Sequence, residues 1–296
     1  MREDKMRNDM TNIILDSVFE NGFMLKGLNS LRDGQASIRE FRFNGADPRW
    51  FLCQWNSRHN LIGAGAVPKG GGYEISDASK RLVTDGNGGI VFRLDASREY
   101  DVPRKADEAW PHLLIEQNIG LHNRIEDLDS ITLRGKFRLT ALKNHMNGSE
   151  RDYHTAQFVW VVVLKNTNEK SSDYQRFIWV VICLLDTRYD FAPLFCQQDK
   201  ALPDGEFIYC FNGRDYMSYT LASGREAEIC FDIYPRIEKI LSAAKRAGFL
   251  PRTETADLTI TGTNMGFEIT GTFDAEVAAR DLGIYVRKKS GGKYER

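Results

Sequence analysis

The residues of this chain that could do chemistry gather in the stretch AWPHLLIEQN, residues 109–118. If this stretch forms a β-strand, side chains two positions apart share a face, so Trp110, His112 and Glu116 lie together. An aromatic ring can pack on a sugar ring while an imidazole and a carboxylate hydrogen-bond its hydroxyls. The face is therefore a candidate binding cleft. The alternative is that it is only the solvated side of a sheet.

Two other stretches offer groups of the same kind. In TNMGFEIT, residues 263–270, strand alternation puts Asn264 and Glu268 on one face. The stretch ICLLDTRY ends in three residues that could add a rim to the cleft: Asp186, Arg188 and Tyr189. The alternative for the first two of these is a surface ion pair, which contributes little to stability.

The same residues would also suit two classes of enzyme. Glycoside hydrolysis needs two carboxyl groups, about 5–5.5 Å apart for retention and about 6.5–9.5 Å apart for inversion. Glu116 and Glu268 could supply them if their strands are neighbours, and a raised pKa on one would make it the acid. A polysaccharide lyase needs a base beside a neutralised uronate, for which the candidates are His112, Tyr189 and Arg188.

Composition limits the other classes of function. The chain has 296 residues and a formal net charge of −1, whereas a nucleic-acid-binding protein usually carries a basic face. The N-terminal stretch lacks the apolar core of a signal peptide, and no window reaches the ~18 apolar residues that span a membrane. We therefore expect a cytoplasmic protein that binds neither nucleic acid nor membrane.

Cysteine and histidine spacing gives no metal signature. The five cysteines form no CxxC pair, and the five histidines form no HxH or HExxH pattern. We therefore expect neither a disulfide framework nor a transition-metal site. No cofactor is required by these patterns, although loop carboxylates and carbonyls could hold a structural calcium ion.

Strand signals dominate the chain. About a dozen short apolar or alternating runs, separated by Gly, Asn and Asp turns, predict an all-β antiparallel sandwich of two sheets. The last three of these runs are GEFIYCFN (205–212), ADLTITGTNMGFEITGTFD (256–274) and DLGIYVRKK (281–289). We expect one domain over residues 1–296, with a core from about 13 to 288 and frayed ends. FVWVVVL and FIWVVIC are apolar on both faces and predict central strands covered on both sides, with Trp160 and Trp179 in the core.

One segment departs from the strand pattern. In FDIYPRIEKILSAAKRAGFL the apolar residues recur at helical spacing, with lysines and an arginine on the other side and a glycine at the end. This spacing predicts one amphipathic helix over residues 234–247, packed on the outside of the sandwich with its apolar stripe inward.

Five stretches occur in an order that resembles a known architecture: FENGF, QWNS, REYDVPRKADEAWPHLLIEQN, FIWVVICLLDTRY and MGFEITGTFD. Over about residues 19–287 the chain resembles a group of bacterial proteins with a concanavalin A-like jelly roll. The resemblance implies two antiparallel sheets, one of them curved with a concave face. Its superfamily includes lectins, carbohydrate-binding modules, β-glucanases and polysaccharide lyases, but a shared fold does not fix the function. The E-x-D-x-x-E pattern of laminarinase-like glucanases is absent.

We therefore expect lectin-like recognition of a sugar or glycoside on the concave face. The residues expected to carry it are Trp110, His112, Glu116, Asn264, Glu268, Asp186, Arg188 and Tyr189. One alternative is a glycoside hydrolase or lyase using the same face. Another is a non-catalytic subunit of an assembly, with edge strands or the helix as its interface, and the chain could then form an oligomer.

Overall fold

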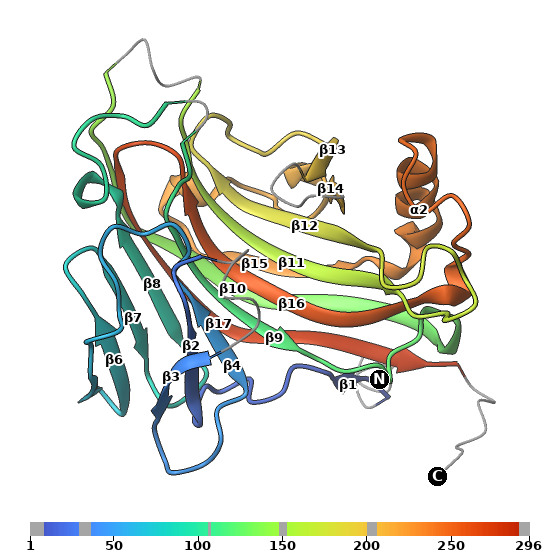
Figure 1. The fold of residues 1–296 in the computed structure, drawn as a ribbon, viewed down its shortest axis with the longest axis horizontal. Helices are drawn as coiled ribbons and strands as arrows, with labels where there is room; N and C mark the ends of the chain where they lie inside the picture. The colour runs from blue at the N-terminus through green and yellow to red at the C-terminus, as the bar shows by residue number, and fades with distance from the viewer. Residues whose placement is uncertain (1–8, 30–36, 106–107, 148–152, 200–205, 290–296) are drawn as a thin grey trace.

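Most strands of the chain bury one face and leave the other partly exposed. Two sheets therefore stack with their buried faces together. In β8 (Ile90–Asp95), for example, buried and half-buried residues alternate along the strand. The computed structural model describes residues 9–29, 37–105, 108–147, 153–199 and 206–289. It is a jelly-roll sandwich, as the sequence predicts (Figure 1). The expectation of frayed ends concerns residues 1–8 and 290–296, which lie outside the described residues.

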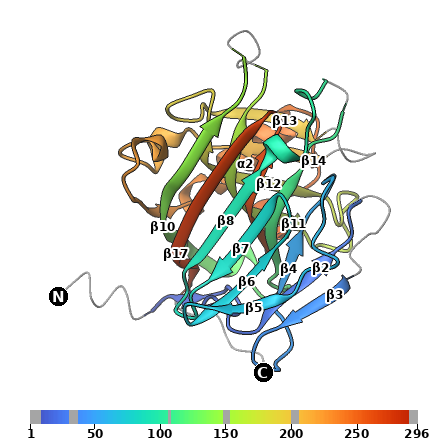
Figure 2. The same ribbon diagram turned by 90° about the vertical axis from the view of Figure 1, so that its left-hand side faces the viewer.

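The first sheet, sheet A, has the strand order β15-β10-β17-β8-β7-β6-β5, and β1 pairs with β17 at one end. Figure 2 shows strands β5 to β8 side by side with β17 and β10. Besides β8, the strands of this sheet are β1 (Thr11–Asn12), β5 (Ala66–Lys69), β6 (Gly72–Ser76), β7 (Lys80–Thr84), β10 (Leu128–Asn144), β15 (Ala227–Asp232) and β17 (Phe273–Lys288).

The second sheet, sheet B, has the strand order β13-β14-β12-β11-β16-β9-β4-β2-β3. Two of its pairs, β2 with β4 and β12 with β14, are parallel, so the sheet is mixed rather than wholly antiparallel. Its strands are β2 (Gly22–Lys26), β3 (Ser37–Arg42), β4 (Trp50–Cys53), β9 (His112–Asn118), β11 (Ala156–Asn166), β12 (Phe177–Asp186), β13 (Phe195–Asp199), β14 (Glu206–Cys210) and β16 (Leu258–Ile269).

The core lies between the two sheets and takes residues from Ile13 to Val286. The rings of Phe92 and Phe158 join sheet A to sheet B, with centroids 5.3 Å apart. Trp160 is fully buried, and its indole N–H donates to the Thr263 hydroxyl at 3.0 Å. Its predicted place in the core is therefore confirmed.

The two apolar strands, β11 and β12, are central in sheet B and covered on both faces, as predicted. The face of sheet B turned away from the core, called the outer face here, carries a second apolar cluster. Its buried members are Val159, Val161, Val181, Cys183, Ala192 and Cys210. Trp179 packs half-buried against this second cluster and not between the sheets, because it pairs across the strands with outward-facing Val163.

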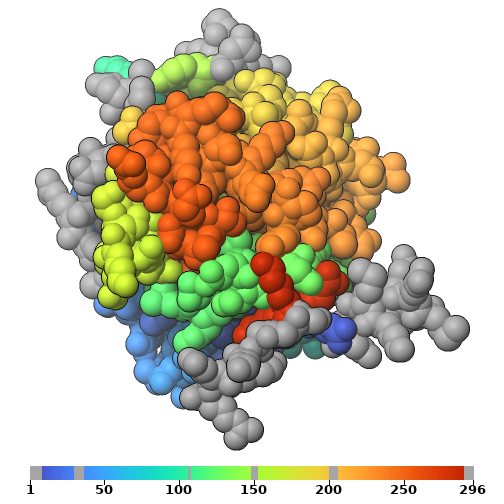
Figure 3. Space-filling view, turned by 90° about the vertical axis from the view of Figure 1, so that its right-hand side faces the viewer, coloured from blue at the N-terminus to red at the C-terminus, as the bar shows by residue number. Residues whose placement is uncertain are grey.

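The predicted helix forms as α2 (Ile237–Arg246), preceded by a 3₁₀ turn, η6 (Tyr234–Arg236). Its apolar stripe joins the main core, so α2 closes the end of the sandwich beside β14 rather than lying outside it. Figure 3 shows the orange segment that contains α2 covering this end. Among the described residues, no helix is long and apolar enough to cross a membrane.

The last strands differ from the prediction in where they break. β16 stops at Ile269, and β17 then runs without interruption to Lys288, whereas the sequence suggested a separate strand starting at residue 281. Asp281 has a positive φ of 58°, and the pairing of β17 with β10 shifts register beside it. The apparent strand start is therefore an irregularity inside one long strand. The prediction also omitted β15.

A buried ion pair fixes the connections that follow β4 and β8 to strand β7 of sheet A. Glu99, which follows the turn η1 (Ala96–Arg98), accepts hydrogen bonds from the Lys80 ammonium at 2.9 Å and from the Ser79 hydroxyl. Its other carboxylate oxygen accepts from the backbone N–H groups of Arg58 and His59. The side chains of Lys80 and Glu99 are 0% and 1% exposed, so Glu99 depends on Lys80 as its buried cation, which also pairs with Asp77 at 3.1 Å.

Replacing one partner of this pair should destabilise the fold. Lys80→Met leaves the Glu99 carboxylate buried without its cation, and we expect the free energy of unfolding to fall by about 3–5 kcal/mol. Arg280→Met is the matched control, because it removes one partner of an exposed ion pair with Glu226 and should cost less than about 1 kcal/mol. Urea unfolding measures both, and equal losses would contradict the assignment.

Candidate functional site

Strand β9 turns its polar side chains to the outer face of sheet B. Leu113 and Ile115 are fully buried in the core, and His112 and Glu116 lie on the opposite side. The predicted shared face is therefore confirmed for these two residues. Trp110 stands just before β9, and its indole N–H donates to Oε2 of Glu268 at 3.2 Å.

Four polar side chains line up across four neighbouring strands. Glu268 on β16 pairs with His112 on one side and with Gln157 on the other. Gln157 on β11 in turn pairs with Asp186 on β12. Neighbouring strands lie about 4.8 Å apart, so these residues form one continuous row across the sheet. We call it the polar row: His112, Glu268, Gln157 and Asp186.

Most of the residues predicted for a site meet at this row. Besides three of the row's own members, Trp110 lies at one end, and Arg188 and Tyr189 lie at the other. Gln157 was missed, because it stands in an otherwise apolar strand and its polar neighbours come from other strands. The strand pairing alone reveals its place.

Glu268 is the central carboxylate of the row. Its side chain is 31% exposed, and Nε2 of His112 lies 3.6 Å from its Oε2. Burial raises the pKa of Glu268, but the hydrogen bonds and charge of His112, together with the Trp110 N–H, outweigh it and leave that pKa below its ordinary value. Glu268 is therefore a carboxylate at neutral pH, which suits an acceptor of hydrogen bonds rather than a general acid.

His112 and Trp110 hold each other in place beside Glu268. Their rings are stacked, with centroids 5.8 Å apart. Nδ1 of His112 lies 3.4 Å from the carbonyl oxygen of Trp55, and the Trp55 ring meets the imidazole edge-on. The guanidinium of Arg104 lies 5.1 Å from the Trp110 ring centroid. Part of the Trp110 ring is thus already covered, and its N–H is its clearest contribution to the site.

Asp186 is a buried anchor rather than half of a surface ion pair. Arg188 donates to both of its oxygens, at 2.9 and 2.6 Å, and Gln157 and Thr155 donate at 2.7 and 2.8 Å. Burial raises the pKa of Asp186, but the bonds and charge of Arg188 outweigh it and lower the pKa overall. Beside this pair Tyr189 is 48% exposed, with the Arg188 guanidinium 5.4 Å from its ring centroid, and it supplies the aromatic ring at this end.

Glu116 and Asn264 form a second polar cluster on the same outer face. They stand directly opposite each other on β9 and β16. Glu116 makes an ion pair with Lys26, whose side chain is only 1% exposed and whose ammonium lies 4.7 Å from the ring centroid of Phe51. Lys26 was missed by sequence reasoning, because its strand, GFMLK, carried no pattern of its own.

The structure does not bring Glu116 and Glu268 together. They share a face of neighbouring strands, but their positions differ by four residues along the strands. At about 3.3 Å per residue their backbones are about 13 Å apart along the strands. The two carboxylates also have different partners, Lys26 for Glu116 and His112 with Trp110 for Glu268. Gly266 lies between the two glutamates on the outer face of sheet B. A Cβ at this position would come within 2.1 Å of the Leu113 carbonyl oxygen, so the position needs glycine.

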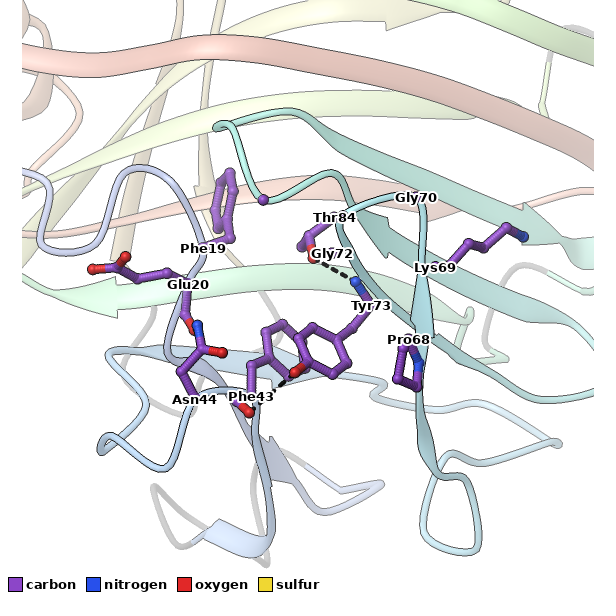
Figure 4. A pocket seen from close by; sticks show the side chains of 12 residues that line it. Phe19, Glu20, Phe43, Asn44, Pro68, Lys69, Gly70, Gly72, Tyr73 and Thr84 are labelled. Carbon is purple, nitrogen blue, oxygen red and sulfur yellow. Dashed lines mark hydrogen bonds between the residues drawn. The ribbon is translucent and has the colours of Figure 1, made fainter.

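A cavity of about 460 Å³ lies elsewhere, between the β5–β6 turn and the chain around Phe19 and Phe43 (Figure 4). The rings of Phe43 and Tyr73 stack in it with centroids 4.1 Å apart. None of the residues predicted for a site lines this cavity. In Figure 4 the charged ends of Glu20 and Lys69 point away from it, so it offers less chemistry than the polar row.

A metal centre has no support in the part of the chain that the structure describes. There, no three His, Cys, Asp or Glu side chains come close enough to hold an ion.

The lowered pKa of Glu268 should make the stability of the protein depend on pH. A carboxyl group with a lower pKa in the folded state stabilises the fold above its unfolded pKa of about 4.3 and loses that contribution as the pH falls further. Glu268→Gln should therefore lower the melting temperature at pH 7. The difference in melting temperature between this variant and the unsubstituted protein should become smaller as the pH falls from 5 to 3. Glu228→Gln, at an exposed position on β15, is the control. A difference in melting temperature for Glu268→Gln that does not change with pH would contradict the lowered pKa of Glu268.

Comparison with known proteins identifies similar folds. No family model matches the chain, and no curated protein matches it. Among solved structures, a family 12 xyloglucanase from Bacillus licheniformis is 11% identical, with 77% of this chain and 91% of that chain covered and a TM-score of 0.44. Endoglucanase Cel12A from Rhodothermus marinus is 14% identical, covering 76% and 96%, with a TM-score of 0.40. The xyloglucanase domain of NopAA from Sinorhizobium fredii, in complex with cellobiose, is 10% identical, covering 77% and 98%, with a TM-score of 0.43. Such identities relate the chains by fold alone.

Proposed function

We propose that the protein binds carbohydrate at the polar row on the outer face of sheet B. The observation that carries this proposal is the alignment of His112, Glu268, Gln157 and Asp186 in register across four strands. Trp110 and the exposed ring of Tyr189 flank the row at its two ends. Planar polar groups beside aromatic rings are the means by which proteins hold sugars.

The charges along the row suit a ligand rich in hydroxyl groups. Glu268 is a partly exposed carboxylate that can accept hydrogen bonds from hydroxyls, and the Gln157 amide both donates and accepts. The negative charge of Asp186 is already balanced by the bidentate guanidinium of Arg188. The row therefore offers mixed donors and acceptors without a strong net charge.

Retaining hydrolysis has little support from these side chains. It needs two carboxyl groups about 5–5.5 Å apart, which is the spacing of directly opposed side chains on neighbouring strands. The residues directly opposed to Glu268 are an imidazole, His112, and an amide, Gln157, and neither can serve as the second carboxylate. The lowered pKa of Glu268 also disfavours its use as the acid.

Hydrolysis with inversion is the second candidate, on the single ground that Glu268 and Asp186 lie two strands apart on one face, about 9.6 Å between backbones. The pKa values of both carboxyl groups are lowered, so neither suits the role of the acid. A lyase has weaker support, because Arg188 is bound to Asp186 and Tyr189 stands at the far end of the row from His112.

Binding should depend on Glu268. We expect a thermal-shift screen against neutral monosaccharides, oligosaccharides and uronates, with and without calcium, to reveal a ligand that stabilises the protein by about 2.7 kcal/mol at 100 times its dissociation constant. Glu268→Gln should weaken binding of that ligand at least tenfold, about 1.4 kcal/mol, while Glu228→Gln on sheet A should not change it.

Assaying the protein–sugar mixtures of the thermal-shift screen for reaction products distinguishes binding from catalysis. Released reducing ends that disappear in both Glu268→Gln and Asp186→Asn would favour the inverting hydrolase, and unsaturated products would favour a lyase. A ligand that binds without turnover would favour the binding protein. If no sugar shifts the melting temperature of the unsubstituted protein, the proposal is wrong.

A further inference from the structure

We infer that the ligand is an extended oligosaccharide that runs along β9 and β16 and also contacts the second polar cluster, Glu116 and Asn264. This inference rests on the proposed function, since it assigns a second subsite to the same face. Both clusters belong to the same pair of neighbouring strands and point to the same side. The direction from one to the other is therefore the direction of the strands themselves.

The second cluster has the chemistry of a sugar subsite. Glu116 is 18% exposed, and the amide of Asn264 stands half-buried directly opposite it. The half-buried ring of Phe51 pairs with Glu116 from the other side. A carboxylate, an amide and an aromatic ring at one place can hydrogen-bond hydroxyls and pack on a sugar face.

Lys26 acts as a positioning residue for this cluster. Its ammonium pairs with Oε1 of Glu116 and lies below the rings of Phe51 and Trp55, at 4.7 and 5.8 Å from their centroids. A structural role alone is the competing explanation, but a buried ion pair is seldom more stabilising than an apolar pair of the same size. Its clearest effect is to hold Glu116 in place, with one carboxylate oxygen turned toward the cation.

Trp55 connects the two clusters. It is half-buried, its ring centroid lies 5.7 Å from that of His112, and the same ring lies over the Lys26 ammonium. Between the clusters the floor consists of glycine at position 266 and the buried side chain of Leu114. The half-buried Trp55 ring lies between the two clusters and is the surface that a ligand continuing from one cluster to the other would meet.

Distance sets the size of the ligand. The clusters are four residues apart along the strands, about 13 Å, which is too far for one sugar ring to contact both. A chain of sugars that reaches both would gain affinity, because the second contact is made at high effective concentration once the first has formed. A single sugar would occupy only the polar row.

The test is a series of linear oligosaccharides of increasing length. Gluco-, manno- and xylo-oligosaccharides of one to six units are titrated calorimetrically into the unsubstituted protein, Glu116→Gln, Asn264→Ala, Tyr189→Ala and Glu268→Gln. We expect affinity to rise at least tenfold once the chain is long enough to span the clusters. Asn264→Ala and Glu116→Gln should abolish this rise in affinity with chain length, whereas Glu268→Gln should weaken the binding of all lengths.

Two results would overturn the inference without touching the proposed function. Affinity independent of length would mean that the polar row alone binds. A length dependence lost in Tyr189→Ala but kept in Asn264→Ala would mean that the ligand follows the polar row across the strands. Asn264→Ala leaves the Lys26–Glu116 pair intact, so it gives an answer even if Glu116→Gln fails to fold. Binding of no sugar at any length would instead refute the proposed function.

Discussion

The site depends on the register in which β16 pairs with β9 and β11, because that register places Glu268 between His112 and Gln157. A slip of one residue would turn Glu268 into the core and Phe267 out of it. Phe267 is fully buried and packs edge-on against Phe158 at 5.0 Å, so the apolar face of β16 resists such a slip. The Thr263 hydroxyl adds a polar restraint, since it donates to the Val161 carbonyl and accepts from Trp160.

Each carboxylate of the two polar clusters on the outer face is paired. The Glu268 carboxylate contacts the Trp110 N–H and His112. Asp186 accepts hydrogen bonds from Arg188 and from two neutral donors, and Glu116 makes an ion pair with Lys26. A buried charge without such partners would cost several kcal/mol. The same rule applies to the Lys80–Glu99 pair, which is fully buried and has a structural role. Partial exposure is what separates Glu268 and Glu116 from that pair.

The local spacing of apolar and polar residues made the fold class, the helix and the buried face of individual strands predictable. It placed His112 with Glu116 and Asn264 with Glu268, because a strand's own sequence determines which residues share a side. It could not determine which strands are neighbours or in which register they pair, since pairing joins residues far apart in the chain, such as His112 and Glu268. For that reason Gln157 and Lys26 were missed. The strands of Glu116 and Glu268 are neighbours, but their register places each glutamate opposite another residue. The helix was located correctly, and its apolar stripe faces the core.

The parallel pairing of β12 with β14 has a consequence for how the molecule can vary. Two parallel strands need a connection that crosses over a face of the sheet. Here that connection includes β13, and both Ala192, which precedes it, and Phe195, its first residue, pack in the second apolar cluster of the outer face. Loops tolerate insertions and deletions better than strands do. A change of length in the loop before β13 would therefore alter the cover over this cluster, while the strands beneath it stay the same.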